Sequence, residues 1–319
     1  MFNFFVRCND WLGKNMFIVV LSGLFIGFSV DIADSSFLRA VVIALFAYMT
    51  FVTALSTSFK DFIKVLLRPW ISLWVLILVH LVTPFTAWIV GLIFYPDEPY
   101  IRLGYLIGAS IPIGVTSVIW TALVKGNLPV SLVAVTLDTL IVPIVMPLFL
   151  HLVIGQTIHL DYLKMIEELM LMVTLPSIAG MLLHDWTDGR ISRFSKSFGG
   201  ATSKIALLFV IAINAAVVMP QIAWNATIIK TLLVTLFVVS SGYFVGYLGS
   251  FALKDRSHEM KLTMVFNVGI RNNACGLVIA LTYFPPAVAI PMTLAILYQQ
   301  PLATIIFRMF KQLKPAEGY

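Results

Sequence analysis

Ten long apolar stretches constrain this chain more than any other feature of its sequence. Each is close to the roughly 20 residues that a helix needs to cross about 30 Å of hydrocarbon. They lie at residues 15–31, 37–57, 69–95, 102–124, 128–154, 162–184, 202–221, 228–252, 260–283 and 286–308. Inside a bilayer, only helices and closed barrels satisfy their own backbone hydrogen bonds. The sequence therefore predicts an all-α polytopic membrane protein with ten transmembrane helices.

The composition agrees with a protein that is solvated mostly by lipid. Of the 319 residues, 60% are apolar and 11% are charged, and the mean hydropathy is +0.98. A soluble chain carries about 25% charged residues and about 45–50% apolar ones. An ordinary cytosolic enzyme, a disordered protein and a secreted disulfide domain are therefore excluded. The two cysteines, Cys8 and Cys275, are too few for a disulfide framework.

The basic residues sort onto one side of the expected membrane. The amino-terminal segment, the even-numbered connections and the tail carry Arg7, Lys14, Lys60, Lys64, Arg68, Lys125, Arg190, Arg193, Lys196, Lys204, Lys254, Arg256, Lys261, Arg308, Lys311 and Lys314. The other side carries only Arg39, Arg102, Lys164 and Lys230, with acidic residues that include Asp31 and Asp34. Because basic connections stay in the cytoplasm, we expect a multi-pass protein of the plasma membrane with both termini cytoplasmic. The net charge of +6 is then a signal of orientation and not a nucleic-acid-binding surface.

The ten helices divide naturally into two sets of five. The longest basic connection runs from residue 184 to 204, so residues 1–184 hold the first five helices plus the sixth, and residues 185–319 hold the rest. When a half with an odd number of helices is repeated, its two copies must cross the membrane in opposite directions, as in many proteins built from inverted repeats. The fourth helix is interrupted by Pro112 and Gly114, and the ninth by the polar run NVGIRNNACG. We therefore expect two inverted five-helix repeats whose broken helices 4 and 9 carry a site at the membrane midplane.

Two ionisable residues lie deep inside predicted spans. Arg271 is more than three helical turns from either end of the ninth helix, so snorkelling alone would not bring its guanidinium to water. It is either a structural charge on unwound carbonyls, a fixed cation that faces an anionic ligand, or a replacement for a coupling cation. Asp138 lies seven residues after Ser131 on the same face of the fifth helix. It either carries a proton or forms an ion pair with Arg271.

Other polar side chains gather at the same depth. The third helix contains His80, which is either hydrogen-bonded to a neighbour or titrates. Amide and hydroxyl oxygens, which hold small cations, are supplied by Asn267, Asn272, Asn273, Ser117, Ser131, Gln299 and Gln300. The sequence has no Cys and His metal cluster, no phosphate-binding glycine loop and no nucleophile elbow. We therefore expect neither an enzyme nor a resident cofactor or metal, beyond a coupling ion.

Three stretches together resemble one known family. They are PIGVTSVIWTALVKGN at residues 112–127, the segment 131–143 that follows, and NVGIRNN at residues 267–273. In these stretches the chain is similar to the bile acid:sodium symporter family of ten-helix membrane proteins. The resemblance implies a panel domain (helices 1, 2, 6 and 7) and a core domain (helices 3–5 and 8–10). It also implies that helices 4 and 9 cross where they unwind, with sodium behind the crossing and an organic anion between the domains.

The resemblance also assigns residues, and several of them depart from the family pattern. Ser117 and Ser131 match sodium ligands, and Val268 and Ile270 match positions that offer carbonyls. On the substrate side Asn272, Gln299 and Gln300 match, Gly114 and Thr116 lie at the other break, and Arg271 is the expected contact of the anion. The departures are Val79 for a glutamine, Val118 for an asparagine, Val135 for a hydroxyl residue, Asn267 for the bridging glutamate and Arg271 for a glutamine.

These departures lead to the predicted function. A site with fewer oxygens, one negative charge less and an added guanidinium should bind sodium poorly. We expect a secondary active transporter of an organic anion, a carboxylate or sulfonate on an apolar body, in which classical sodium coupling is weakened or lost. Sodium and a proton are both candidate coupling ions, and Asp138, absent from the family pattern, balances Arg271 or carries the proton. A sodium symporter with a rearranged site and an uncoupled facilitator or channel are the alternatives. The expected partners are the small anion and the lipid bilayer, with no nucleic acid and no protein partner implied.

Overall fold

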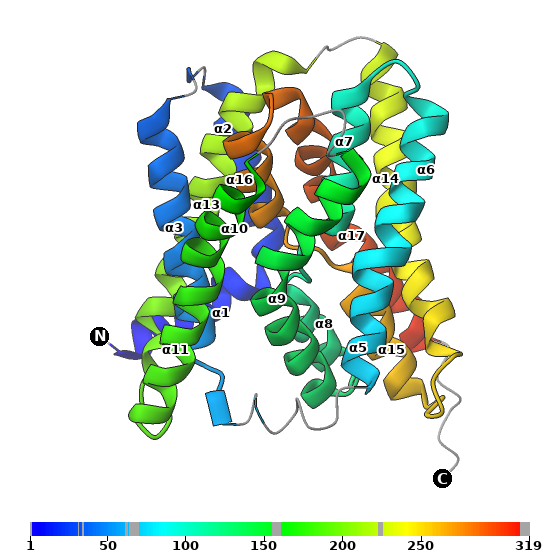
Figure 1. Cartoon of the computed structure of the whole chain (residues 1–319). Coiled ribbons are helices and arrows are strands. Elements are labelled where there is room, and N and C mark those ends of the chain that lie inside the picture. Colours follow the sequence, from blue (N-terminus) through cyan, green and yellow to red (C-terminus); the bar gives the residue numbers. More distant parts are fainter. Residues whose placement is uncertain are drawn as a thin grey trace. The chain divides into compact units, whose positions relative to one another are not determined.

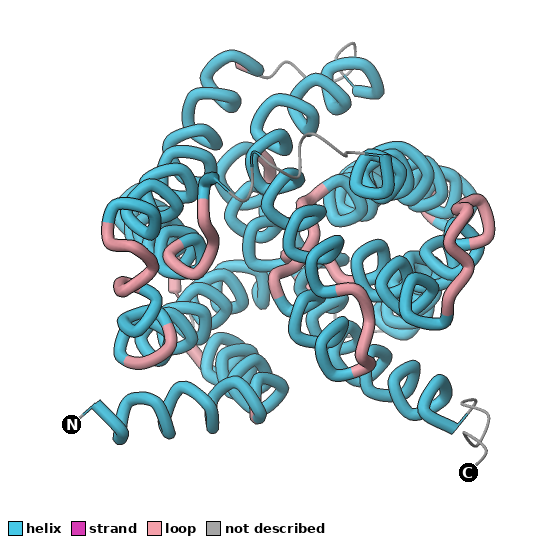
Figure 2. The backbone as a smooth tube through the Cα atoms, turned by 90° about the horizontal axis from the view of Figure 1, so that it is seen from below, coloured by secondary structure: helices cyan, strands magenta, loops and turns pink. Residues whose placement is uncertain are grey.

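The structure is a computed structural model that describes residues 2–30, 32–33, 35–60, 63, 70–154, 161–222 and 226–312. Within these ranges the chain forms helices and no strand (Figure 1). Loops are short connections between the helices, as Figure 2 shows. Asp31, Asp34, Lys64, Arg68 and Lys314, which entered the prediction of orientation, lie outside the described residues.

The helices belong to two compact units, which are described separately. The first unit draws on residues 1–69, 136–223 and 274–290. Its helical elements are α1 (Phe2–Lys14), α2 (Met16–Ser29), α3 (Ser36–Ala54), α10 (Tyr162–Leu169), η2 (Met170–Thr174), α11 (Leu175–Trp186), α12 (Ser192–Ser195), α13 (Phe198–Val218), η3 (Met219–Gln221) and η4 (Pro286–Ala289), with most of α9 (Leu128–Ile154) and α16 (Asn273–Tyr283).

Small residues allow helices of the first unit to approach closely. Helix α13 packs against α1, α2 and α3. A Cβ added to Gly27 of α2 would lie 2.4 Å from the carbonyl oxygen of Ala212 in α13, so a larger residue does not fit there. Such small contacts are how helices associate in lipid, where apolar burial gives little driving force.

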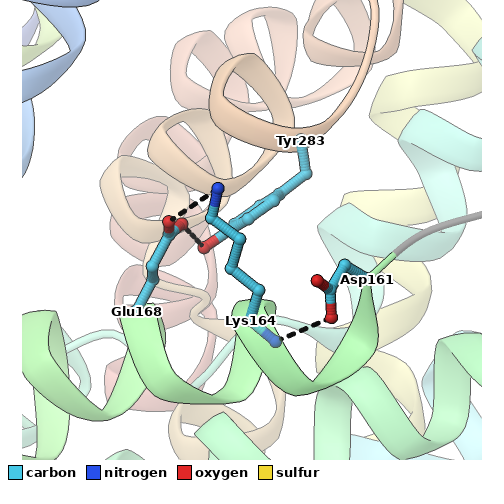
Figure 3. A network of polar contacts seen from close by, with 4 residues as sticks. All are labelled: Asp161, Lys164, Glu168 and Tyr283. Atoms are coloured by element: carbon cyan, nitrogen blue, oxygen red, sulfur yellow. Dashed lines mark hydrogen bonds and ion pairs between the residues drawn. The ribbon is translucent and has the colours of Figure 1, made fainter.

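A polar network ties two helices of the first unit together (Figure 3). Asp161 caps α10, since its Oδ1 accepts a hydrogen bond from the Lys164 backbone N–H at 3.0 Å. The Nζ of Lys164 lies 3.9 Å from Oε1 of Glu168, one turn further along the helix. The hydroxyl of Tyr283, the last residue of α16, donates to Oε2 of Glu168. This network fastens the end of α16 to α10.

The second unit draws on residues 70–135, 224–273 and 291–319. Its elements are α5 (Trp70–Ile77), η1 (Leu78–Val82), α6 (Thr83–Phe94), α7 (Pro99–Ser110), α8 (Thr116–Leu123), α14 (Ala226–Ser250), α15 (His258–Gly269) and α17 (Ile290–Gln312), with the first turns of α9. The buried core of this unit includes Val75, Val79, Ile113, Met264 and Val268.

The prediction of an all-helical chain is confirmed over the described residues, whereas ten spans in two inverted repeats stay a prediction. Seven helices of the described chain are long and apolar enough to cross a membrane, or eight if α1 and α2 form one span bent by 77°. The helix α1 was not among the predicted stretches, because Asn3, Arg7, Asn9 and Asp10 interrupt its apolar residues. The predicted breaks are confirmed: α7 ends at Ser110 before α8 begins, and α15 ends at Gly269 before α16 begins.

Candidate functional site

The breaks of α7/α8 and α15/α16 lie directly against each other within the second unit. Ile113 and Arg271 form an antiparallel bridge. The N–H of Gly114 donates to the Ile270 carbonyl at 2.9 Å, and the N–H of Asn272 donates to the Pro112 carbonyl at 2.8 Å. Backbone that leaves the helix at membrane depth must find such partners, because lipid offers none. The prediction that the two breaks meet is thus confirmed.

The local sequence explains why the backbones meet here. Pro112 has no N–H with which to continue α7, so the helix stops before it. Gly114 permits the close approach, since an added Cβ would lie 2.8 Å from the Arg271 carbonyl oxygen and 3.1 Å from Cγ2 of Ile270. The crossing therefore depends on a residue without a side chain at position 114.

Behind the crossing, two serines meet one amide. Oγ of Ser131 donates to Oδ1 of Asn267 at 3.0 Å, and Oγ of Ser117 lies 3.5 Å from the same oxygen. The amide nitrogen of Asn267 donates to the Thr263 carbonyl at 2.8 Å, which fixes the orientation of the side chain. All four residues are fully buried. The structure thus brings together three of the residues that the sequence assigned to an ion site.

The guanidinium of Arg271 reaches the third predicted span. Its Nη2 donates to the Val79 carbonyl at 3.2 Å and to the Thr83 hydroxyl. Arg271 is only 8% exposed. Hydrogen bonds from a charged donor to buried acceptors are stronger than neutral ones, so these contacts hold Arg271 against the third span.

A π-helical turn makes the Val79 carbonyl available. In η1 the Thr83 N–H donates to Leu78, five residues earlier. In the same register the Val79 carbonyl would accept from the N–H of residue 84. That residue is Pro84, which has no N–H, so the Val79 carbonyl is left without a backbone donor in this register. The Thr83 hydroxyl at 3.0 Å and the Arg271 guanidinium bond to this carbonyl instead. Turns of this kind occur frequently at functional sites.

The two adjacent glutamines of α17 contact different parts of the crossing. Oε1 of Gln299 accepts from the Arg271 backbone N–H at 3.0 Å and from Nδ2 of Asn273 at 3.1 Å. Oε1 of Gln300 accepts from Nε1 of Trp120 at 2.9 Å, and its Nε2 donates to Thr116 at 3.4 Å. Gln299 therefore belongs with Arg271, whereas Gln300 belongs with the start of α8.

A cavity of about 50 Å³ adjoins Arg271 inside the second unit. It is lined by residues of α6, α7, α14, α17 and the α15/α16 break. Its polar lining includes Arg271, Thr83, Asn273 and Gln299, and much of the remainder is glycine, alanine or another small or apolar residue. No carboxylate lines this cavity, so the charge at its wall is positive.

The remaining predicted residues lie apart from this group or serve it through the backbone. The Ile270 carbonyl accepts from Gly114, and Val268 is fully buried in the core. Asp138 is fully buried on α9 but belongs to the first unit, so its pairing with Arg271 stays a prediction. His80 lies within the π turn.

Sequence reasoning missed the partners of Arg271 in the third span. Nothing marked the Val79 backbone as an acceptor, although Val79 itself was singled out as a departure from the family. The signal that was present is the pair Thr83–Pro84 inside an apolar stretch. A proline there frees a carbonyl one turn earlier, and a threonine beside it supplies a hydroxyl.

The fold and this site define a multi-pass helical membrane protein in which two broken helices cross at a polar centre. A family model for the Sodium Bile acid symporter family matches residues 42–242. The chain belongs to this family. It is therefore a membrane transporter of a sodium-coupled class rather than an enzyme.

Several known proteins are similar along most of their length. The chain is 33% identical to the "Uncharacterized protein YbaS" of Bacillus subtilis over 274 residues, which cover 85% of this chain and 89% of that protein. It is 24% identical to the "Uncharacterized sodium-dependent transporter YocS" of the same organism, over 89% of this chain and 87% of that one. Similarity to the "Probable sodium/metabolite cotransporter BASS2, chloroplastic" of rice is 22% identity over 76% of this chain and 57% of the relative.

Proposed function

We propose that this protein is a secondary active transporter of an organic anion in which the guanidinium of Arg271 replaces one bound sodium. The substrate class is a bile-acid-like carboxylate or sulfonate on an apolar body. Transport proceeds by alternating access, and classical sodium coupling is weakened or lost. The observation that carries the proposal is the bond from Arg271 to the Val79 carbonyl and Thr83 hydroxyl, oxygens of the kind that would hold a cation.

The contacts of Asn267 support the loss of a sodium ion behind the crossing. In the family pattern this position is a bridging glutamate, whose charge offsets bound cations. Here it is a neutral amide, and the hydroxyls of Ser117 and Ser131 are both directed at its oxygen. A hard cation needs several oxygens with negative charge nearby, so this donor set does not fit a sodium site.

The positive charge of Arg271 also opposes sodium binding, and the size of this repulsion can be calculated. A sodium ion bound about 4 Å from the guanidinium would be repelled by roughly 4 kcal/mol at an effective dielectric constant of about 20. Because about 1.4 kcal/mol is a factor of ten, the affinity would fall on the order of a thousandfold. The fixed cation instead stabilises the crossing permanently, without an ion from solution.

The architecture proposed with this function has ten spans in two inverted repeats. The spans are α2, α3, α5–α6, α7/α8, α9, α10–α11, α13, α14, α15/α16 and η4–α17. Helices 1, 2, 6 and 7 form the panel and the others the core, with both termini cytoplasmic in the plasma membrane. The substrate contacts are Gly114, Thr116, Arg271, Asn272, Gln299 and Gln300. No cofactor, nucleic acid or protein partner is part of the proposal, and Asp138 is the candidate carrier of a coupling proton.

Uptake by proteoliposomes tests the proposal. Labelled taurocholate, a sulfonate on an apolar body, and a panel of simpler carboxylates are offered to vesicles loaded with the unlabelled compound. We expect saturable counterflow that changes less than about twofold when choline replaces sodium. Flux without counterflow would make the protein a channel or facilitator. A steep sodium dependence that survives replacement of Asn267 or Arg271 would contradict the proposed role of these residues.

A sodium-coupled symporter with a rearranged site is the second candidate, and the names of two relatives favour it. It is distinguished in the same vesicles by Asp138→Asn. If a proton is the coupling ion, the variant loses the pH dependence of uptake. If sodium remains the coupling ion, the sodium dependence persists in the variant.

A further inference from the structure

We propose that α1 lies flat in the membrane interface and binds lipids with anionic headgroups through its outer face. This outer face is defined by Phe4, Arg7, Trp11 and Lys14. Three features of the first unit support the assignment: the angle between α1 and α2, the contacts that hold the opposite face of α1, and the charge around it. The inference goes beyond the proposed function, because it requires neither a transported substrate nor a coupling ion.

The bend between α1 and α2 places α1 along the membrane surface. The two helices meet at Asn15 and differ in direction by 77°. Helix α2 has no charged side chain and exposes Phe25 among other large apolar residues, as a helix within hydrocarbon does. Helix α1 has 13 residues, so it is only about 20 Å long, and it carries Arg7, Asp10 and Lys14. A helix that is too short and too polar to cross about 30 Å of hydrocarbon, and nearly perpendicular to a helix inside it, runs parallel to the membrane surface.

The inner face of α1 is held by the rest of the first unit. The ring of Phe5 packs edge-on against Phe198 of α13, with 5.0 Å between the ring centroids. One turn further along, Nδ2 of Asn9 donates to the Lys196 carbonyl at 3.0 Å, and its Oδ1 accepts from Nζ of Lys204. Residues 5 and 9 therefore lie on the side of α1 that faces protein, and the opposite side faces the surroundings.

The outer face of α1 combines exposed aromatic rings with basic side chains. Phe4 is 67% exposed and Trp11 is 57% exposed. Arg7 and Lys14 are exposed as well, and the members of each pair are seven residues apart, about two helical turns, so the four side chains form one stripe. Aromatic residues beside Lys or Arg are typical of helices at the headgroup level, where the rings reach the acyl chains and the cations reach phosphates.

The charge around α1 selects an anionic lipid. The segment 187–198 adjoins α1 through the bond between Asn9 and Lys196. In α1 and this segment the exposed charged residues are two acidic ones, Asp10 and Asp188, and five basic ones, which are Arg7, Lys14, Arg190, Arg193 and Lys196. Each basic residue near an anionic membrane raises the affinity by about fivefold. A second copy of this chain would bring the same positive surface, which repels its like, so a lipid surface is the occupant that fits.

Hydrogen exchange of the full-length protein in nanodiscs tests this inference. One set of discs contains phosphatidylcholine alone, and the other contains three parts of phosphatidylcholine to one part of phosphatidylglycerol. Because both leaflets have the same composition, the result does not depend on which side of the membrane α1 occupies. The backbone amides of residues 6–14 should exchange more slowly in the anionic discs, by about fivefold or more, since exchange requires α1 to leave its bound state.

The conditions separate this test from the test of transport. High salt should reduce the difference between the two sets of discs, because it screens exposed charges. Neither substrate nor sodium is present, so failure here is distinct from failure of the proposed function.

Matched charge deletions locate the lipid. Arg7→Gln with Lys14→Gln should remove most of the difference between the two sets of discs. Lys254→Gln with Arg256→Gln, which deletes two exposed basic residues of the α14/α15 connection, should keep it. Phe4→Ser with Trp11→Ser should speed exchange in both sets, because the aromatic contribution does not depend on headgroup charge.

The wild-type protein alone decides the matter if a variant fails to fold. Equal exchange of α1 in the two sets of discs at low salt overturns the proposal, and so does a difference that persists in the double variant of Arg7 and Lys14. Protection that appears only in discs with two copies of the protein also overturns it, because it would assign the outer face to a second copy of this chain.

Discussion

Replacing Gly114 by alanine should destabilise the protein by separating the two crossing backbones. The new Cβ would lie 2.8 Å from the Arg271 carbonyl oxygen, and ordinary contact requires about 3.4 Å. Because the obstacle is backbone, one segment must move by roughly 0.6 Å. That movement stretches the bond from the Gly114 N–H to Ile270, now 2.9 Å, beyond the usual hydrogen-bond range.

The magnitude follows from these two effects. Overpacking of this kind costs about 1–3 kcal/mol, and the weakened backbone bond costs about 1 kcal/mol more. A total of about 2–4 kcal/mol should lower the unfolding midpoint by about 3–6 °C for a chain of this length. The assay is thermal unfolding in detergent, followed by the near-ultraviolet signal or by tryptophan fluorescence.

A second glycine provides the matched control. A Cβ at Gly242 of α14 would lie 3.5 Å from its nearest neighbours, an ordinary contact distance. Gly242→Ala should therefore be neutral or stabilise the helix by up to about 1 kcal/mol. If Gly114→Ala proves as stable as Gly242→Ala, the crossing is not held by the backbone contact described here.

Three further substitutions test single contacts. Thr83→Val removes a hydroxyl that accepts from Arg271, and it should lower the free energy of unfolding by about 1–3 kcal/mol in the same thermal assay. Thr83→Ser keeps a hydroxyl and should recover most of that loss. Equal midpoints for the valine and serine variants would contradict the contact. Ser131→Ala removes the 3.0 Å bond to the Asn267 amide and should cost about 1 kcal/mol, and a stabilised variant would argue against that bond. Tyr283→Phe removes the hydroxyl bonded to Glu168 and should speed hydrogen exchange at the end of α16, where unchanged protection would contradict the fastening role.

The helix breaks could be predicted from sequence because their causes are local. Pro112 lacks the N–H that would continue the helix and Gly114 follows it closely, whereas the run from Asn267 to Asn273 is too polar for a continuous span. The rule that unwound segments in corresponding positions mark a binding centre further predicts that both breaks carry the site, and this stays a prediction.

The contacts of the site could not be predicted, because they join residues far apart in the chain. Ser117, Ser131 and Asn267 come from three different helices, and only the packing of α8, α9 and α15 directs both hydroxyls to one amide. The bond from Arg271 to Val79 depends on a π turn, a feature that hydropathy does not reveal. The helix α1 was missed because polar residues interrupt its apolar ones, so hydropathy did not mark it as a long apolar stretch.

Direct binding of ²²Na⁺ to the purified protein tests the central claim, that Arg271 and Asn267 have replaced a sodium site. The wild-type protein is compared with the triple variant Val79→Gln, Asn267→Glu, Arg271→Gln, which restores three of the five residues that depart from the family pattern. The account predicts no saturable binding by the wild type at millimolar sodium, and saturable binding by the variant. Saturable binding by the wild type with an affinity equal to or better than that of the variant would contradict it.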